Sequence, residues 1–249
     1  MTALPRAFLD RPLAHRALHD AKQGRVENSL GAIEAAIAQG YGLEIDVQLT
    51  GDGEALVFHD PELVRLTGLD GRVRDHSLAE MTRIPLKHSA EAPPPLAEVL
   101  TRVAGRVPLL VELKSHPSKE TPEDGALARA VARALATYDG PVAVMSFNPD
   151  AVASFQTLSP DCPIGLVTKD FATEPGLTQA RADHLSAITD FDRVGASFIS
   201  HDRRSLQMAP VHALKSRGVP VLTWTIRSPE EAKTALETAD NITFEGYLP

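Results

Sequence analysis

The sequence predicts an α/β fold, a (β/α)8 TIM barrel with a small insertion after strand two. Short apolar runs alternate with segments of helical spacing along most of the chain, which is typical of βα units around a parallel sheet. Eight such runs occur in 249 residues, and a closed barrel of eight units takes about 250 residues. We therefore expect one barrel domain over residues 1–249.

The strands and the helices between them follow in order from this periodicity. Strands are expected at 12–15, 43–49, 107–113, 142–147, 164–167, 196–199, 219–226 and 241–244. Leu30, Ile33 and Ile37 share one face of the first helix, which ends near Gly40. Further helices are expected at 96–103, 126–138, 149–158, 177–191, 208–216 and 229–236.

Residues 51–95 interrupt the alternation of strands and helices. Thr50-Gly51-Asp52-Gly53 is a turn signal, and residues 55–59 can return as a short strand. We interpret 51–95 as an insertion that caps part of the barrel mouth and returns His59 to the site. A second domain is the alternative, but a segment of this size without a periodic core is too small to fold independently without disulfides or metals.

The composition excludes several classes of protein. A net charge of −8 argues against a partner that is a nucleic acid or an anionic membrane surface. No apolar stretch approaches the roughly 18 residues of a membrane span, and the N-terminus lacks the apolar core of a signal peptide. The single Cys162 fits a reducing compartment. We expect a cytoplasmic protein without stable membrane insertion, and the oligomeric state stays open.

Three carboxylates lie within apolar strands: Glu44 and Asp46 in the second, and Glu112 in the third. Burying a charge without a partner is costly. Glu44 and Asp46 are two residues apart, so both face the same side of the strand, which at a barrel mouth is the site. Carboxylates without cysteine favour one hard divalent cation, Mg²⁺ or Ca²⁺. An ion-pair layer with Arg16 and Lys114 is the alternative interpretation.

Two histidines and two cations accompany the carboxylates. His15 and His59 each close a strand-like run and can serve as general acid and general base. Arg16 can bind a phosphate bidentately, and Lys114 shares the face of Glu112. Together these groups favour cleavage of a phosphate ester. The absence of a Gly-rich phosphate loop and of a G-x-S-x-G motif disfavours nucleotide kinases and serine hydrolases.

Several motifs resemble those of one family, the glycerophosphodiester phosphodiesterases. They are Ala14-His15-Arg16, Glu27-Asn28-Ser29, Glu44-Ile45-Asp46-Val47, Thr50-Gly51-Asp52-Gly53, Val57-Phe58-His59-Asp60, Leu63-Val64-Arg65-Leu66-Thr67, Glu112-Leu113-Lys114 and, more weakly, Val221-Leu222-Thr223-Trp224-Thr225. The resemblance implies a (β/α)8 barrel and metal-dependent hydrolysis of a small-molecule glycerophosphodiester. The products would be sn-glycerol 3-phosphate and an alcohol.

The resemblance also implies a role for each residue of the constellation. It implies metal ligands at Glu44, Asp46 and Glu112, an acid/base pair at His15 and His59, and phosphate contacts at Arg16 and Lys114. Which histidine is the acid stays open. Trp224, on strand seven of the barrel, can pack against the glycerol carbons or can be an ordinary core or rim aromatic.

The sequence departs from the usual family pattern at several positions. Ala17 stands where glycine is usual, Val26 where proline is common and Arg227 where asparagine is common. The C-terminus reads Asn241-Ile242-Thr243-Phe244-Glu245-Gly246, whereas Thr-Asp-x-Pro after a Gly-rich run is common. None of these changes removes a predicted ligand or catalytic residue, but they leave the preferred alcohol open.

Two other functions compete with the leading one. A phospholipase C- or D-like enzyme acting on lysolipids would share the barrel and the constellation, but it would favour an apolar mouth. The insertion is mixed in character, with leucines among arginines and Asp70. A non-catalytic barrel that binds a phosphorylated ligand would not need an acid/base pair.

Overall fold

The computed structural model describes residues 2–115 and 125–249, and it confirms the predicted barrel. Its strands are β1 (Leu13–Ala14), β2 (Gly42–Leu49), β3 (Ala55–Val57), β4 (Leu109–Leu113), β5 (Val142–Ser146), β6 (Ile164–Thr168), β7 (Phe198–Asp202), β8 (Val221–Ile226) and β9 (Asn241–Phe244). The sheet runs β1-β9-β8-β7-β6-β5-β4-β2-β3, and β1 also pairs with β2. This last pairing closes eight parallel strands into a ring, and every predicted strand overlaps an observed one.

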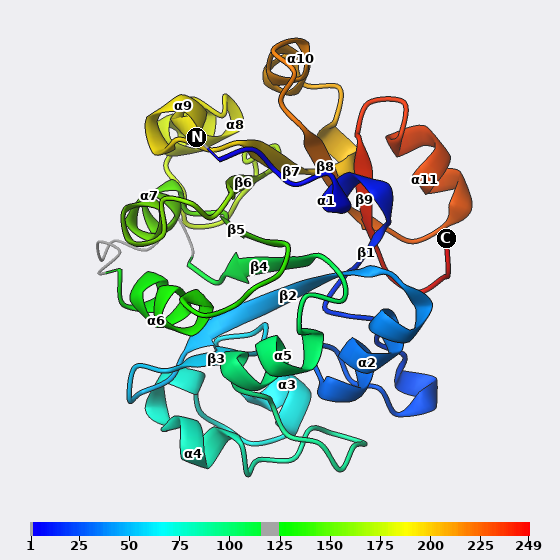
Figure 1. The fold of residues 1–249 in the computed structure, drawn as a ribbon. Coiled ribbons are helices and arrows are strands. Elements are labelled where there is room, and N and C mark those ends of the chain that lie inside the picture. The colour runs from blue at the N-terminus through cyan, green and yellow to red at the C-terminus, as the bar shows by residue number, and fades with distance from the viewer. Residues whose placement is uncertain (1, 116–124) are drawn as a thin grey trace.

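Helices surround the strands (Figure 1). They are α1 (Ala7–Asp10), α2 (Leu30–Gln39), α3 (Val64–Thr67), α4 (Leu78–Met81), α5 (Leu96–Val103), α6 (Ala126–Leu135), α7 (Pro149–Leu158), α8 (Gln179–Ser186), α9 (Asp190–Val194), α10 (Ala209–Ser216) and α11 (Pro229–Ala235), with 3₁₀ turns at Ala21–Gln23, Val73–Asp75 and Arg203–Ser205. Among the described residues, no helix is long and apolar enough to cross a membrane.

The predicted helix over 177–191 is wrong in one respect, because it is two helices, α8 and α9. The chain breaks at Ile188, whose φ of 53° no helix interior allows. Leu185, Ile188 and Phe191 are all buried, so the three-residue apolar spacing continues across the break. Sequence periodicity alone therefore could not reveal it.

The barrel interior is divided into an apolar end and a polar end. Leu13, Leu110, Phe198 and Leu222 form one buried cluster at the amino ends of their strands, and Phe8 of α1 packs into it. Because successive residues of a strand alternate between its two faces, the next inward-facing positions on these strands lie nearer the carboxyl ends. Polar side chains gather there, so the structure places the site at the barrel mouth.

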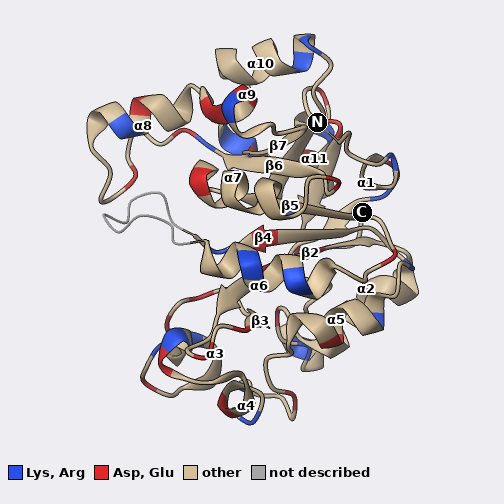
Figure 2. Ribbon diagram, turned by 60° about the vertical axis from the view of Figure 1, so that its left-hand side comes forward, with Lys and Arg blue, Asp and Glu red and all other residues tan. Residues whose placement is uncertain are grey.

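Residues 51–95 leave the barrel after β2. β3 pairs antiparallel with β2, with Val47 opposite Val57, and α3 and α4 lie beyond it on the same side (Figure 2). The segment has its own small apolar cluster, formed by Leu56, Phe58, Leu63, Leu66, Val73, Met81 and Leu86. Its two helices have four residues each, which is too short to show a helical period in the sequence.

Candidate active site

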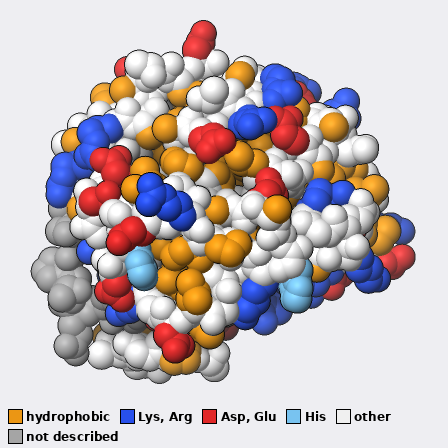
Figure 3. Space-filling model, turned by 90° about the horizontal axis from the view of Figure 1, so that it is seen from below, with side chains coloured by type: hydrophobic (Ala, Val, Ile, Leu, Met, Phe, Trp, Pro, Cys, Tyr) orange, Lys and Arg blue, Asp and Glu red, His pale blue; other side chains and the backbone are white. Residues whose placement is uncertain are grey.

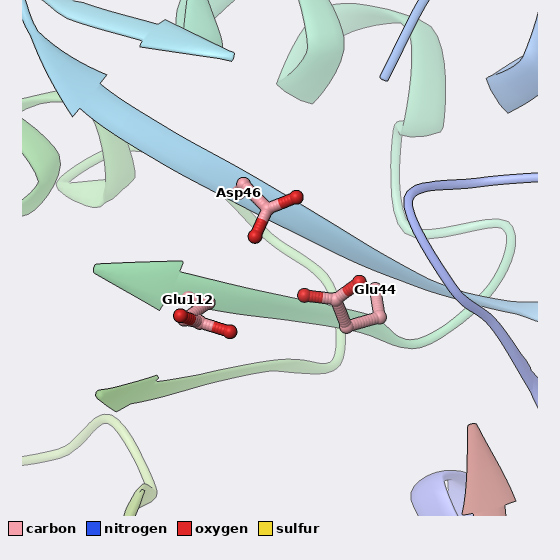
Figure 4. Close-up of side chains that lie close together, drawn as sticks. All are labelled: Glu44, Asp46 and Glu112. Atoms are coloured by element: carbon pink, nitrogen blue, oxygen red, sulfur yellow. The ribbon is translucent and has the colours of Figure 1, made fainter. Parts of the chain in front are cut away.

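Three carboxylates meet at the mouth because of the register between β2 and β4. Asp46 is paired with Glu112, and Glu44 lies two residues before Asp46 on the same face. One oxygen from each residue lies within 4.8 Å of the others, and all three side chains are buried. Figure 4 shows them converging from the two strands. The structure thus brings together the three predicted metal ligands.

The electrostatics of this cluster suit a divalent cation. Burial, followed by the charges of Asp46 and Glu112, raises the pKa of Glu44 well above its usual value. Its Oε1 is buried and lacks a hydrogen-bond partner, which is costly for a carboxylate. An oxygen-only set of buried carboxylates is the ligand type that Mg²⁺ and Ca²⁺ prefer. The residues present therefore suit a hard cation.

Lys114 lies between two of these carboxylates. Its Nζ is 2.8 Å from Glu112 Oε1 and 3.4 Å from Asp46 Oδ1. Burial alone would lower the pKa of Lys114, but Glu112 and Asp46 raise it above its usual value. For the Asp46 carboxyl the effect of burial is opposite and would raise the pKa. The charge of Lys114, followed by that of His59, nevertheless holds the pKa of Asp46 well below the normal range. Lys114 is therefore charged and Asp46 is ionised.

Arg16 follows β1 and contacts the cluster through its backbone and its side chain. Its N–H donates to Glu44 Oε2 at 2.9 Å. Its guanidinium donates to Glu27 Oε1 at 2.9 Å and lies 3.7 Å from Asp46. Its Nε is buried without a hydrogen-bond partner, so this donor is available to an incoming anion.

His59 is carried to the site by the hairpin of β2 and β3. The N–H of Phe58 donates to the carbonyl of Asp46 at 3.0 Å, and Gln48 donates to the carbonyl of His59 at 2.8 Å. His59 Nδ1 is 2.6 Å from Asp60 Oδ1. Burial lowers the pKa of His59 despite the nearby charge of Asp46, which favours a neutral imidazole.

His15 reaches the site from β1. Its Nδ1 is 2.5 Å from Oε2 of Glu245, which directly follows β9. Glu245 Oε1 is in turn 2.7 Å from a guanidinium nitrogen of Arg227. Glu245 is not among the predicted site residues. The only sequence signal for it is its position at the end of the strand that neighbours His15.

One cavity of about 210 Å³ joins these groups. It is lined by His15, Arg16, Glu44, Asp46, His59, Glu112, Lys114, Met145, Phe147, Val167, Ser200, Trp224, Thr225, Arg227 and Thr243. All eight predicted site residues are therefore in one pocket. One wall is apolar: the ring of Trp224 meets that of Phe147 edge-on at 5.6 Å between centroids, and its Nε1–H donates to the carbonyl of Ser200.

Comparison with known proteins identifies relatives along most of the chain. The model of the glycerophosphoryl diester phosphodiesterase family matches residues 15–239. A glycerophosphodiester phosphodiesterase from Caldanaerobacter subterraneus is 26% identical over 219 residues, covering 85% of this chain and 84% of the relative. One from Bacillus altitudinis is 31% identical over 173 residues, covering 66% of this chain and 69% of the relative.

Solved structures share the architecture. The structure of a phosphodiesterase from Oleispira antarctica, in complex with the product sn-glycerol-3-phosphate, superposes with a TM-score of 0.76 at 25% identity. It covers 96% of this chain, and this chain covers 94% of it. A glycerophosphodiester phosphodiesterase from Parabacteroides distasonis superposes with a TM-score of 0.74 at 25% identity, with coverage of 93% and 91%.

Proposed function

The chain belongs to the glycerophosphoryl diester phosphodiesterase family and is an enzyme of that class, and we propose that it hydrolyses glycerophosphodiesters to sn-glycerol 3-phosphate and an alcohol. The observation that carries this proposal is the single pocket that holds two histidines, two cations and three clustered carboxylates. The related Oleispira enzyme was solved with sn-glycerol-3-phosphate, which supports the same product here.

One divalent cation, Mg²⁺ or Ca²⁺, is the proposed cofactor. Glu44, Asp46 and Glu112 would hold it, since their oxygens lie within 4.8 Å of one another. Such an ion would supply Lewis-acid chemistry at this position, by neutralising phosphoryl charge and favouring ionisation of an oxygen nucleophile. Arg16 and Lys114 bind the non-bridging phosphate oxygens and orient the diester with its scissile bond toward the histidines.

His15 and His59 are the proposed acid/base pair. Each engages its Nδ1 with a carboxylate, so Nε2 is the atom left to move a proton. One imidazole accepts the proton of the attacking oxygen, and the other donates a proton to the departing alkoxide. The apolar wall around Trp224 excludes water from one side of the pocket and packs against the glycerol carbons.

The distribution of charge on the protein surface supports a soluble small molecule as the partner. On the face shown in Figure 3, acidic and basic side chains are interspersed around a group of apolar ones, and no broad basic surface suited to nucleic acid is visible there. We propose that residues 51–95 are an insertion that flanks the mouth of a single-domain enzyme. With a free thiol at Cys162, we place the enzyme in the cytoplasm.

The test compares glycerophosphocholine, glycerophosphoethanolamine and bis(p-nitrophenyl) phosphate as substrates, with and without EDTA. We expect both glycerol substrates to be cleaved faster than the third, which lacks glycerol, because a site that hydrogen-bonds a hydroxyl rejects analogues lacking it. EDTA should abolish activity, and added Mg²⁺ or Ca²⁺ should restore it. Faster cleavage of the glycerol-free diester would instead indicate a general phosphodiesterase.

A further inference from the structure

Both histidines of the pocket are attached to the same kind of partner, a carboxylate that is itself paired with an arginine. His59 is bonded to Asp60, which Arg65 contacts through Nε and Nη2. His15 is bonded to Glu245, which Arg227 contacts. The first arrangement is local to the 51–95 segment: Asp60 is one position from His59 and five positions from Arg65. The second joins residues that are 230 positions apart in the chain.

Glu245 is placed against His15 by the pairing of β1 with β9. Ala14 is paired with Phe244, so His15 and Glu245 both follow the last paired position of their strands. The N–H of His15 donates to the carbonyl of Phe244 at 2.8 Å, which fixes the backbone on this side. The Glu245 side chain is only 19% exposed, so its charge is largely shielded from water.

Neighbouring side chains stabilise the ionised form of Glu245. The hydrogen bond from His15, followed by the interaction with His19, holds the pKa of Glu245 well below its usual value. His19 Nε2 is 3.7 Å from the same Oε2, too far for a hydrogen bond. Arg227 binds the other oxygen, Oε1. The carboxylate is therefore ionised and held from two sides, with one oxygen assigned to His15.

Resting on the proposed function, we propose that Glu245, held by Arg227, is a positioning residue that fixes the tautomer and the orientation of His15. With Glu245 ionised, His15 carries its proton on Nδ1 and donates it to Oε2. The lone pair is then on Nε2. This atom can accept a proton, which gives an imidazolium, and can later donate the same proton to restore the neutral ring. Glu245 stabilises this imidazolium without taking the proton itself, as a carboxylate does in a catalytic triad.

This role gives Arg227 and Glu245 a common explanation. Arg227 and the C-terminal segment are two of the departures from the family pattern expected from the sequence, and in the structure Arg227 contacts Glu245. Arg227 is more than half exposed, so its ion pair with Glu245 contributes little stability by itself. Its proposed contribution is to keep Glu245 from turning toward His19 or toward the cations of the pocket.

The experiment measures steady-state kinetics on glycerophosphocholine for Glu245→Gln, Glu245→Asp and Arg227→Gln. Glu237→Gln, an exposed glutamate, is the matched control. We expect Glu245→Gln to lower kcat about 10²-fold with little change in KM, since an amide leaves the wrong His15 tautomer favoured. Glu245→Asp should recover part of this loss because it restores the charge. Arg227→Gln should lose less than about tenfold.

A second readout does not depend on turnover. Two-bond ¹H–¹⁵N spectra of metal-free protein report which ring nitrogen of His15 carries the proton, with His15→Gln used for assignment. We expect Nδ1–H in the wild type and in Glu237→Gln, and a shift toward Nε2–H in Glu245→Gln. Wild-type tautomer in Glu245→Gln would overturn the proposal even if kcat falls, because the loss would then not act through His15.

A double-mutant cycle closes the test. In His15→Ala, adding Glu245→Gln should cause no further loss of kcat, because Glu245 acts only through His15. A full additional loss in the double variant, or an unchanged kcat in Glu245→Gln alone, would reject the positioning role. If the wild type cleaves no diester at all, the proposed function fails, whereas the tautomer spectra still decide whether Glu245 fixes His15.

Discussion

At the scale of single residues, the turn after β1 places two residues of the site in the left-handed region. Arg16 and Ala17 have φ values of 52° and 64°, a region that costs a non-glycine residue about 1–2 kcal/mol. This turn lets the N–H of Arg16 donate to Glu44 Oε2 and the N–H of Ala17 donate to the Glu44 carbonyl. Such strain is common where a backbone group serves a site.

The position of Ala17 supplies a prediction. Ala17→Gly should keep full activity and change the free energy of unfolding by less than about 1 kcal/mol, since glycine accepts the left-handed region. Ala17→Val should lose about 2 kcal/mol or more, because a β-branched residue is strained there and the site is fully buried. Urea unfolding and kinetics on glycerophosphocholine check both variants, and a valine variant as stable as the glycine one would contradict this account.

His201 supplies a prediction about pH. It is fully buried, hydrogen-bonds with Thr168 and Ser205, and burial lowers its pKa to about 4. The unfolded chain, with an ordinary histidine pKa, binds this proton more readily, so stability falls as pH decreases from the unfolded toward the folded value. This one group should cost about 2 kcal/mol between pH 7 and pH 5.

Urea unfolding at the two pH values measures the cost. His201→Gln should lose that part of the pH dependence, whereas His212→Gln, at an exposed position, should keep it. An equal pH dependence in the wild type and in His201→Gln would show that other groups are responsible.

At the scale of elements, α3 connects the 51–95 segment to the barrel mouth through one side chain. Arg65 of α3 donates to both oxygens of Glu27 at 2.7 and 2.8 Å and to Asp60. Glu27 accepts from Arg16, and Asp60 is bonded to His59. A single arginine thus links the partner of Arg16, the proposed phosphate contact, to the partner of His59, a proposed member of the acid/base pair.

We therefore expect Arg65→Ala to lower kcat/KM about 10-fold, the lower end of the loss that follows removal of a group supporting a metal site. We expect kcat to fall and KM to rise. Asp60 and Glu27, the partners of His59 and Arg16, would each lose their contact with Arg65. Arg74→Ala, at an exposed arginine of the same segment, is the control and should behave like the wild type. A wild-type kcat/KM in Arg65→Ala would show that Arg65 only stabilises the segment.

At the scale of the whole molecule, the strand order and the barrel follow from the sequence because buried strands and amphipathic helices have distinct periods. The short elements α1, α3 and α4 do not, since four residues give no period. Within the site, Glu44, Asp46 and Glu112 are recognisable as charges inside apolar runs. Glu245 has no such signal, and Arg65 stands in a family motif without an assigned role, so only the folded structure shows that their partners are His15 and Glu27.

The carboxylate cluster predicts opposite stability effects with and without metal. Glu44→Gln should raise the melting temperature of the metal-free protein, because it removes a buried acid whose ionised form is disfavoured by burial and by two neighbouring carboxylates. It should also remove most of the stabilisation by Mg²⁺ or Ca²⁺, which for the wild type amounts to about 2.7 kcal/mol at a hundredfold excess over Kd. Thermal melts with EDTA or either cation check this, with Glu237→Gln as control. A Glu44→Gln variant that gains as much from metal as the wild type would exclude Glu44 as a ligand.

The pairing of β1 with β9 has a consequence for biosynthesis. His15 leaves the ribosome 230 residues before Glu245, which lies beyond β9 and emerges after all the other barrel strands. A partly synthesised chain can form βα units. Its sheet is still open, however, and His15 does not yet have Glu245 as a partner. Recovery of turnover during refolding should therefore lag behind the recovery of helical circular dichroism. The length of the delay measures how long β1 and β9 take to pair.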